Sequence, residues 1–197
     1  MQLTEIRIAG FGGQGVILSA TIIGKAAAIY QRAYATMTQS FGPEARGGSS
    51  SAQVILSDEP ILYPYVTQPD ILVVMSQEAF VRFAPELKPE GILIVERDLV
   101  RVSGVPSGTK VYSVPATRLA EELGRRMVQN VVMVGFFGAI TALLDPDALR
   151  SAVADSVPPG SQKLNLQAFD KGFSHALSLF DNGEVESTPV AEPSELP

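Results

Sequence analysis

The chain lacks the residues on which several large classes of protein depend. Its 197 residues include no cysteine and a single histidine, His175. Without thiols the chain cannot form disulfides, bind zinc through thiolates or hold an iron–sulfur cluster of its own. A single histidine also argues against a histidine-based metal site and against a Ser-His-Asp triad. The composition therefore predicts no metal site in this chain.

Long apolar runs and an excess of positive charge are also missing. The longest apolar stretch, residues 131–144, is interrupted by Thr141 and is shorter than the ~20 residues of a membrane span. The first nine residues lack the basic start and apolar run of a signal peptide. An isoelectric point near 4.8 gives no electrostatic footprint for nucleic acid. We expect a cytoplasmic protein that binds neither membranes nor nucleic acid.

The net charge of −6 is concentrated at one end of the chain. Residues 181–197 contain five acidic residues, three prolines and no lysine or arginine. Such a segment cannot bury enough apolar surface to offset the entropy of ordering it, so it is predicted to be a disordered tail. Residues 1–180, with 15 basic and 16 acidic residues, are almost neutral and are predicted to form one domain.

Strands and helices alternate along this domain. Short apolar runs such as residues 71–75 and 91–95 are typical of strands covered on both faces. The sequence predicts strands over residues 5–9, 33–39, 51–56, 71–75, 91–95 and 110–114. Helices are predicted over residues 16–30, 77–83, 117–126, 131–144 and 163–180, with a short helix that begins at Asp145 and Pro146. This alternation predicts a Rossmann-like three-layer α/β fold with a mostly parallel sheet.

Two of these helices carry more specific expectations. Asn130 is predicted to cap the helix over residues 131–144, which should be buried in its own domain because it is apolar nearly all round. Alternatively, Gly135 and Gly138 let a partner subunit pack closely against that helix. The last helix is predicted to have one apolar face, with His175 opposite it on the solvent side. The residues of this face are Leu166, Phe169, Phe173, Leu177 and Phe180.

A glycine-rich turn, residues 10–15, lies between the first strand and the first helix. Its sequence GFGGQG satisfies the pattern G-x-G-x-x-G, in which glycines bring a ligand close to backbone N–H groups at a helix N-terminus. An NAD site would also need an acidic residue at the end of the second strand, but none lies between Glu5 and Glu44. Two interpretations remain: the turn meets an anionic ligand or a partner, or its glycines only let helix and sheet pack closely.

A second glycine-rich loop, residues 40–48, follows the second strand. Glu44 and Arg46 lie between two glycine-containing pairs in it. In an open α/β sheet the loops after the first two strands leave the same edge, so we expect both glycine-rich loops to face one crevice. Arg46 then contacts an anion or a partner chain; alternatively, Glu44 and Arg46 form a solvated surface pair.

Four segments, in order, resemble the gamma subunit of 2-oxoacid:ferredoxin oxidoreductases. They are GFGGQGV (residues 10–16), TQSFGPEARGGSSSAQVILSDEPI (38–61), PDILVVMSQEAF (69–80) and NVVMVGFFGAI (130–140). The resemblance covers roughly residues 3–180. The form of the second segment is most similar to gamma subunits of the 2-oxoglutarate type.

The resemblance implies one subunit of an enzyme that converts a 2-oxoacid and coenzyme A into acyl-CoA and CO2 and reduces ferredoxin. The expected substrate is 2-oxoglutarate, which gives succinyl-CoA, with pyruvate or a branched-chain 2-oxoacid as alternatives. Thiamine diphosphate, magnesium and 4Fe–4S clusters are expected on alpha and beta partner subunits and on a delta subunit where one exists. This chain would hold no catalytic residue and no metal, and would be inactive alone.

In this family the gamma subunit is associated with the coenzyme A side of the catalytic cleft. The resemblance assigns the contacts with coenzyme A, or with a partner at that side, to Gly10, Gly12, Gly13, Gln14, Gly15 and Arg46. Two alternatives remain open. The chain is a freestanding Rossmann-type nucleotide-binding dehydrogenase, or it is a purely structural subunit of the complex that contacts no ligand.

Overall fold

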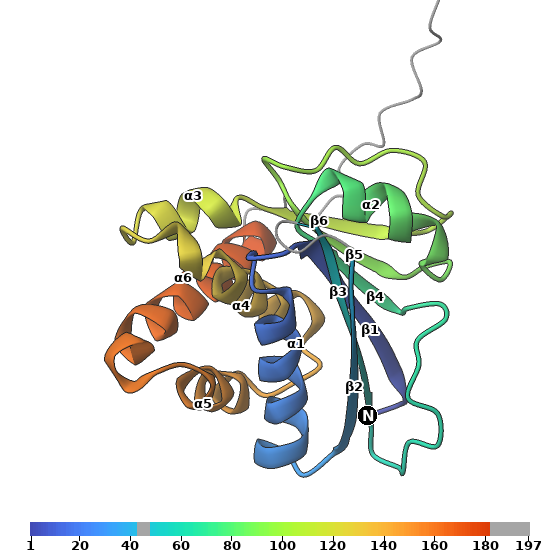
Figure 1. The fold of residues 1–197 in the computed structure, drawn as a ribbon, viewed down its shortest axis with the longest axis horizontal. Helices are drawn as coiled ribbons and strands as arrows, with labels where there is room; N and C mark the ends of the chain where they lie inside the picture. Colours follow the sequence, from blue (N-terminus) through green and yellow to red (C-terminus); the bar gives the residue numbers. More distant parts are fainter. Residues whose placement is uncertain (43–47, 182–197) are drawn as a thin grey trace, which may run out of the picture.

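A six-stranded sheet runs through the protein and separates two layers of helices (Figure 1). The structure, a computed structural model, describes residues 1–42 and 48–181. Within these residues the strand order is β2-β3-β1-β4-β5-β6. The strands are β1 (Thr4–Phe11), β2 (Tyr34–Phe41), β3 (Ser49–Ser57), β4 (Ile71–Val74), β5 (Ile92–Glu96) and β6 (Lys110–Val114). The predicted three-layer α/β fold is confirmed.

The two layers enclose two apolar cores of different size. The larger core includes Ile6, Ile8 and Val73 and lies under five helices, which occupy one side of the sheet in Figure 1. These helices are α1 (Val16–Lys25), α3 (Ala116–Glu121), α4 (Gln129–Thr141), α5 (Pro146–Ser156) and α6 (Gln162–Asp181). The smaller core lies on the opposite face, under α2 (Gln77–Phe83). Shorter helical turns are Ala26–Tyr30, Ala84–Glu86, Arg126–Val128 and Pro159–Ser161.

The sheet is parallel on one side and antiparallel on the other. Strands β1, β4, β5 and β6 run parallel, whereas β3 pairs antiparallel with both β1 and β2. Residues 42–48 are too few for the crossover that a parallel pair needs, so β2 and β3 form a hairpin. Because β1 and β2 are both antiparallel to β3, they point the same way and end at the same edge. We call this the carboxyl edge of the sheet, since β4, β5 and β6 also end there.

Helices α4 and α6 cross with their backbones in close contact. A Cβ atom on Gly135 of α4 would lie 2.0 Å from the carbonyl oxygen of Phe169, and one on Gly172 of α6 would lie 2.0 Å from that of Val132. A Cβ atom on Gly138 would lie 2.7 Å from a methyl carbon of Leu149. These glycines therefore admit helices of the same chain, and the predicted burial of α4 within its own domain is confirmed. The alternative, in which they admit a partner subunit, is wrong.

This crossing also sets which face of α6 is buried. The small residues Ala168, Gly172 and Ala176 face the core, whereas Leu177 and Phe180 are exposed. The predicted apolar face is therefore only partly correct: Phe169 is buried, but the residue of α6 that meets the backbone of α4 is Gly172 rather than a large side chain. The prediction that His175 faces solvent is wrong: this side chain is half-buried, and its ring centroid lies 6.1 Å from that of Phe136.

The start of α5 agrees with the sequence. The carboxylate of Asp145 accepts hydrogen bonds from the N–H groups of Asp147 and Ala148, at 2.7 and 3.2 Å, and Pro146 follows it at the first helical position. At the other end of the chain, α6 continues to Asp181, and residues 182–197 of the predicted tail lie outside the described residues. Within residues 1–42 and 48–181, no helix has the length and hydropathy that crossing a bilayer requires.

A cluster of charged side chains joins β1 and β4 at the edge of the sheet opposite the carboxyl edge. Lys88 donates hydrogen bonds to Glu5 at the start of β1 and to Asp70 just before β4, both at 2.8 Å. Partial burial alone would lower the pKa of Lys88. The hydrogen bonds to Asp70 and Glu5, together with their negative charges, outweigh burial and raise this pKa above its usual value of 10.5.

We expect Gly172→Ala to lower the free energy of unfolding of the isolated chain by about 1–3 kcal/mol, since its methyl group meets the backbone of α4. The matched control is Gly24→Ala in α1, where a Cβ atom has no neighbour within 4 Å. That variant should stabilise the chain slightly, because alanine favours helix. Urea unfolding measures both, and equal effects of the two changes would contradict the close crossing.

We expect Lys88 to contribute to stability only below strongly alkaline pH. A folded-state pKa raised above the unfolded value gives stability that is complete below pH 10.5 and is lost as the pH rises through the folded-state pKa. The difference in unfolding free energy between wild type and Lys88→Met should therefore be constant from about pH 7 to 9 and shrink above about pH 10.5. A difference that grows with pH across that range would contradict this assignment.

Candidate functional site

The glycine turn connects the end of β1 to the start of α1 at the carboxyl edge. Gly13 has φ +91° and Gly15 has φ +76°, values in the left-handed region that residues with a side chain adopt at a cost. Gly10 meets a different constraint, because a Cβ atom there would lie 2.5 Å from Oε1 of Gln14 and 3.1 Å from Cβ of Met75. Glycine is therefore favoured at positions 13 and 15 by the left-handed backbone and at position 10 by the lack of space for a side chain.

The side chain of Gln14 holds the turn in place. Its Oε1 accepts a hydrogen bond from the N–H of Phe11 at 2.7 Å, and its Nε2 donates to the carbonyl oxygen of Met75 at 2.9 Å. One amide therefore joins the last residue of β1 to the residue that follows β4. Both the oxygen and the nitrogen of the Gln14 amide are hydrogen-bonded within the chain. The groups that the turn presents to its open side are therefore backbone groups.

Several N–H groups of the turn have no acceptor in residues 1–42 and 48–181. The N–H of Gly12 donates to the carbonyl oxygen of Gly48 at 2.7 Å, and that of Gln14 donates to Phe11 at 3.1 Å. No described acceptor meets four other N–H groups, those of Gly13, Gly15, Val16 and Ile17. Helix α1 has no side-chain cap and no acidic residue in its first turn. The positive end of its dipole therefore favours an anion at this place.

The second glycine-rich loop ends beside this turn, at the edge that was predicted. Gly48 accepts the hydrogen bond from Gly12, and Phe11 and Gly10 pair with Ser49 and Ser50 of β3. Both loops thus leave the carboxyl edge next to each other. Glu44 and Arg46 lie outside the described residues, so the role of Arg46 stays a prediction.

Asn130 reaches the same turn from the first turn of α4. The predicted cap is wrong, because α4 begins at Gln129 and Val128 precedes it without a side-chain hydrogen bond. Asn130 is 2% exposed, and its Nδ2 donates a long hydrogen bond, 3.4 Å, to the carbonyl oxygen of Gly15. A Cβ atom on Gly15 would lie 2.5 Å from Cγ of Asn130. The sequence did not predict this contact, although a polar residue at the start of an apolar helix indicates that its side chain has a specific partner.

A second buried polar group fixes the neighbouring part of the carboxyl edge. Glu96 is fully buried at the end of β5, and its carboxylate accepts hydrogen bonds from the N–H groups of Asp98, Leu99 and Thr117 at 2.8 to 3.1 Å. The hydroxyl of Thr117 donates to Oε1 of Gln129 at 2.8 Å. These bonds attach the starts of α3 and α4 to the sheet, and the sequence analysis did not single them out.

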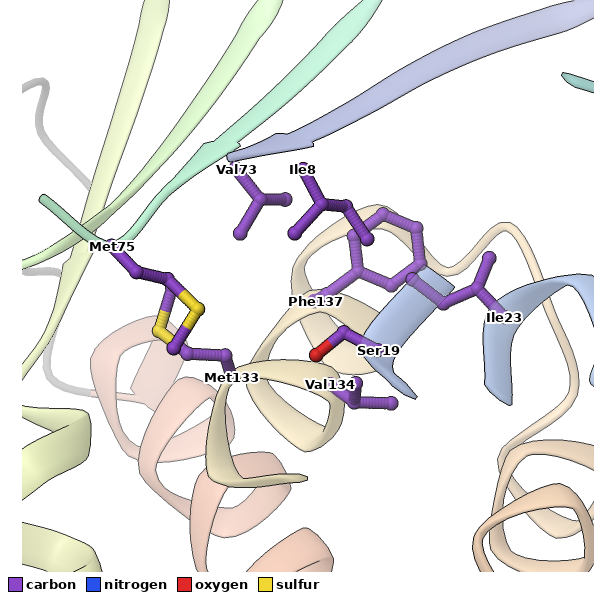
Figure 2. Close-up of a pocket in the computed structure, with 8 residues that line it drawn as sticks. All are labelled: Ile8, Ser19, Ile23, Val73, Met75, Met133, Val134 and Phe137. Atoms are coloured by element: carbon purple, nitrogen blue, oxygen red, sulfur yellow. The ribbon is translucent and has the colours of Figure 1, made fainter. Parts of the chain in front are cut away.

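The cavity that described residues enclose beneath the turn is too small for a substrate. A cavity of about 10 Å³ lies between the sheet and helices α1 and α4, where side chains from all three converge (Figure 2). Its lining residues are Ile8, Ser19, Ile23, Val73, Met75, Met133, Val134 and Phe137. A space of this size holds about one water molecule. This cavity therefore does not hold a ligand of the turn, whereas Gly12 and Gly13 are exposed on the outer side.

The chain offers no ligand set for an iron–sulfur cluster. It contains no cysteine. In the part of the chain that the structure describes, no group of three or more histidine, aspartate or glutamate side chains could hold a metal ion. The residues present therefore do not fit such a cluster.

The chain is similar to known proteins over most of its length. A family model described as pyruvate ferredoxin/flavodoxin oxidoreductase matches residues 5–175. Two relatives named 2-oxoglutarate synthase subunit KorC are 45% identical over 177 residues in Methanocaldococcus jannaschii and 48% identical over 174 residues in Methanothermobacter thermautotrophicus. These alignments cover 89% and 85% of this chain and 95% and 92% of the relatives.

A solved structure has the same fold. The gamma subunit of keto/oxoacid ferredoxin oxidoreductase from Geobacter sulfurreducens matches with a TM-score of 0.81 and 37% identity, over 90% of this chain and 98% of that one. The resemblance to oxidoreductase gamma subunits is thus confirmed. Because the family model matches residues 5–175, which is most of the chain and includes the glycine turn and α4, the chain belongs to the pyruvate ferredoxin/flavodoxin oxidoreductase family.

Proposed function

We propose that the chain is the gamma subunit of a 2-oxoglutarate:ferredoxin oxidoreductase. This enzyme converts 2-oxoglutarate and coenzyme A into succinyl-CoA and CO2 and passes the electrons to ferredoxin. The observation that carries the proposal is the 45% and 48% identity, over nearly the full length, to two proteins named 2-oxoglutarate synthase subunits. The alternative of a freestanding nucleotide-binding dehydrogenase is not supported, since β2 also ends without the acidic residue that a ribose needs.

The chemistry is divided among subunits in this proposal. Thiamine diphosphate with magnesium and the 4Fe–4S clusters lie on alpha, beta and, where present, delta subunits; the absence of cysteine from this chain supports that division. Bound there, the thiamine supplies the carbanion chemistry of decarboxylation. The gamma chain contributes binding and orientation, and we expect it to be inactive alone. A cytoplasmic location stays a prediction of the sequence.

The glycine turn is the part of the chain that we propose meets coenzyme A. Coenzyme A carries phosphates, and the N–H groups of Gly13, Gly15, Val16 and Ile17, which meet no acceptor in residues 1–42 and 48–181, lie where an anion is favoured. Gly10, Gly12 and Gln14 shape this backbone, and Arg46 supplies a cation from the adjacent loop. A phosphate contact that is equally strong in the ground state and the transition state affects the KM for coenzyme A and leaves kcat unchanged.

We expect the complex purified from its native source to turn over 2-oxoglutarate with a higher kcat/KM than pyruvate or a branched-chain 2-oxoacid. The assay supplies coenzyme A and a low-potential electron acceptor, and the isolated chain serves as the inactive control. A preference for pyruvate would overturn the substrate assignment alone. Reduction of NAD by the isolated chain would overturn the subunit assignment.

We expect Gly13→Asp to raise the KM for coenzyme A at least about tenfold, equivalent to ~1.4 kcal/mol, with kcat retained. The added carboxylate repels phosphate at the turn. Gly104→Asp is the matched control, because Gly104 also has positive φ, +62°, and open space around a Cβ atom. Arg46→Ala is a second arm of the same assay and should raise the same KM.

The purely structural alternative gives the opposite result in this assay. If Gly13→Asp and Arg46→Ala assemble into the complex and leave the KM for coenzyme A unchanged, the turn makes no ligand contact. Size-exclusion chromatography of each variant complex checks assembly.

A further inference from the structure

The carbonyl oxygen of Gly15 is held by more donors than a helix start ordinarily provides. It accepts hydrogen bonds from the N–H of Ser19 at 2.9 Å, from the hydroxyl of Ser19 at 3.1 Å and from Nδ2 of Asn130 at 3.4 Å. The hydroxyl of Ser19 also lies 3.5 Å from the carbonyl oxygen of Asn130. The first turns of α1 and α4 are therefore joined at this one oxygen.

Fixing this carbonyl also fixes an N–H group. The carbonyl of Gly15 and the N–H of Val16 belong to the same planar peptide and point in opposite directions. Donors that hold the carbonyl inward, toward the helix, thus hold the N–H of Val16 outward. That N–H is one of the four groups without an acceptor in the described structure.

Stability alone gives a poor account of Asn130. Asn130 is 2% exposed, and the hydrogen bond that its Nδ2 donates to the carbonyl oxygen of Gly15 is long, 3.4 Å. A hydrogen bond longer than the usual range contributes little net stability. The position of Asn130 is nevertheless specific, because the amide occupies the space that a side chain on Gly15 would need.

We propose that Asn130 is a positioning residue that holds the Gly15–Val16 peptide so that the turn binds the phosphate of coenzyme A. This inference rests on the proposed function of the glycine turn. Asn130 touches no ligand itself and acts through Gly15. It also explains why a segment of α4, 115 residues further along the chain, belongs to the same site.

The test uses Asn130→Asp in the assembled complex. Aspartate has the same size but replaces the donor by a carboxylate facing the carbonyl oxygen of Gly15. The KM for coenzyme A should rise about tenfold or more, with kcat and the KM for 2-oxoglutarate within about twofold of wild type. Asn130→Ser, which removes the bond without adding charge, should raise the same KM by a smaller factor and remains informative if the aspartate variant does not fold.

The matched control is Asn165→Asp in α6. Asn165 is also buried, 7% exposed, and its Nδ2 donates to a backbone carbonyl, that of Ser161, at 2.9 Å. The same chemical change there should lower thermal stability but leave the KM for coenzyme A unchanged. Hydrogen exchange of residues 10–20 with and without coenzyme A gives a second readout, in which Asn130→Asp should weaken the protection by coenzyme A.

The outcomes separate the two proposals. If Gly13→Asp raises the KM for coenzyme A but both Asn130 variants leave it unchanged, the positioning role is overturned and the proposed function stands. An equal rise in Asn165→Asp would also overturn it, since general loss of stability would then explain the effect. If neither Gly13→Asp nor the Asn130 variants change that KM, the glycine turn does not bind coenzyme A and both proposals fail.

Discussion

Backbone contact between α4 and α6 is the constraint on which the carboxyl edge depends. Without side chains at Gly135 and Gly172, the two helices approach until the backbone of one meets that of the other. This approach seats α4 deep in the larger core, where every residue from 129 to 138 is buried. The first turn of α4 then lies against the first turn of α1, and Asn130 reaches Gly15. A packing constraint far from the sheet edge thus sets the geometry of the glycine turn.

The carboxyl edge combines hydrogen-bonded support with backbone N–H groups that have no acceptor in residues 1–42 and 48–181. Gln14 joins the turn to the end of β4, and Glu96 gathers three N–H groups around the end of β5. The polar side chains behind the edge are therefore hydrogen-bonded, while the N–H groups at the start of α1 meet no acceptor among the residues that the structure describes. A site arranged in this way requires little reorganisation when an anion binds, which favours affinity.

Local patterns in the sequence predicted most elements, and contacts between distant residues account for what they missed. Continuous apolar runs identified β4 and β5, and the order of strand, glycine turn and helix placed the turn correctly. The antiparallel pairing of β2 and β3 follows from the length of their connection, which is too short for a crossover. The role of Asn130 and the buried face of α6 depend on how α4 packs against α1 and α6. The apolar pattern within a single helix does not predict which helix it packs against. The partial burial of His175 against Phe136 of α4 depends on the same packing and therefore was not predicted.

The absence of cysteine has a practical consequence for studying this subunit. A single cysteine introduced at position 13 would be the only thiol of the chain, at an exposed place with open space around a Cβ atom. The left-handed backbone there makes the change cost about 1–2 kcal/mol, whereas position 15 would add a collision with Asn130. A fluorophore or spin label on that thiol would report directly on what approaches the turn, with no background labelling from the rest of this subunit.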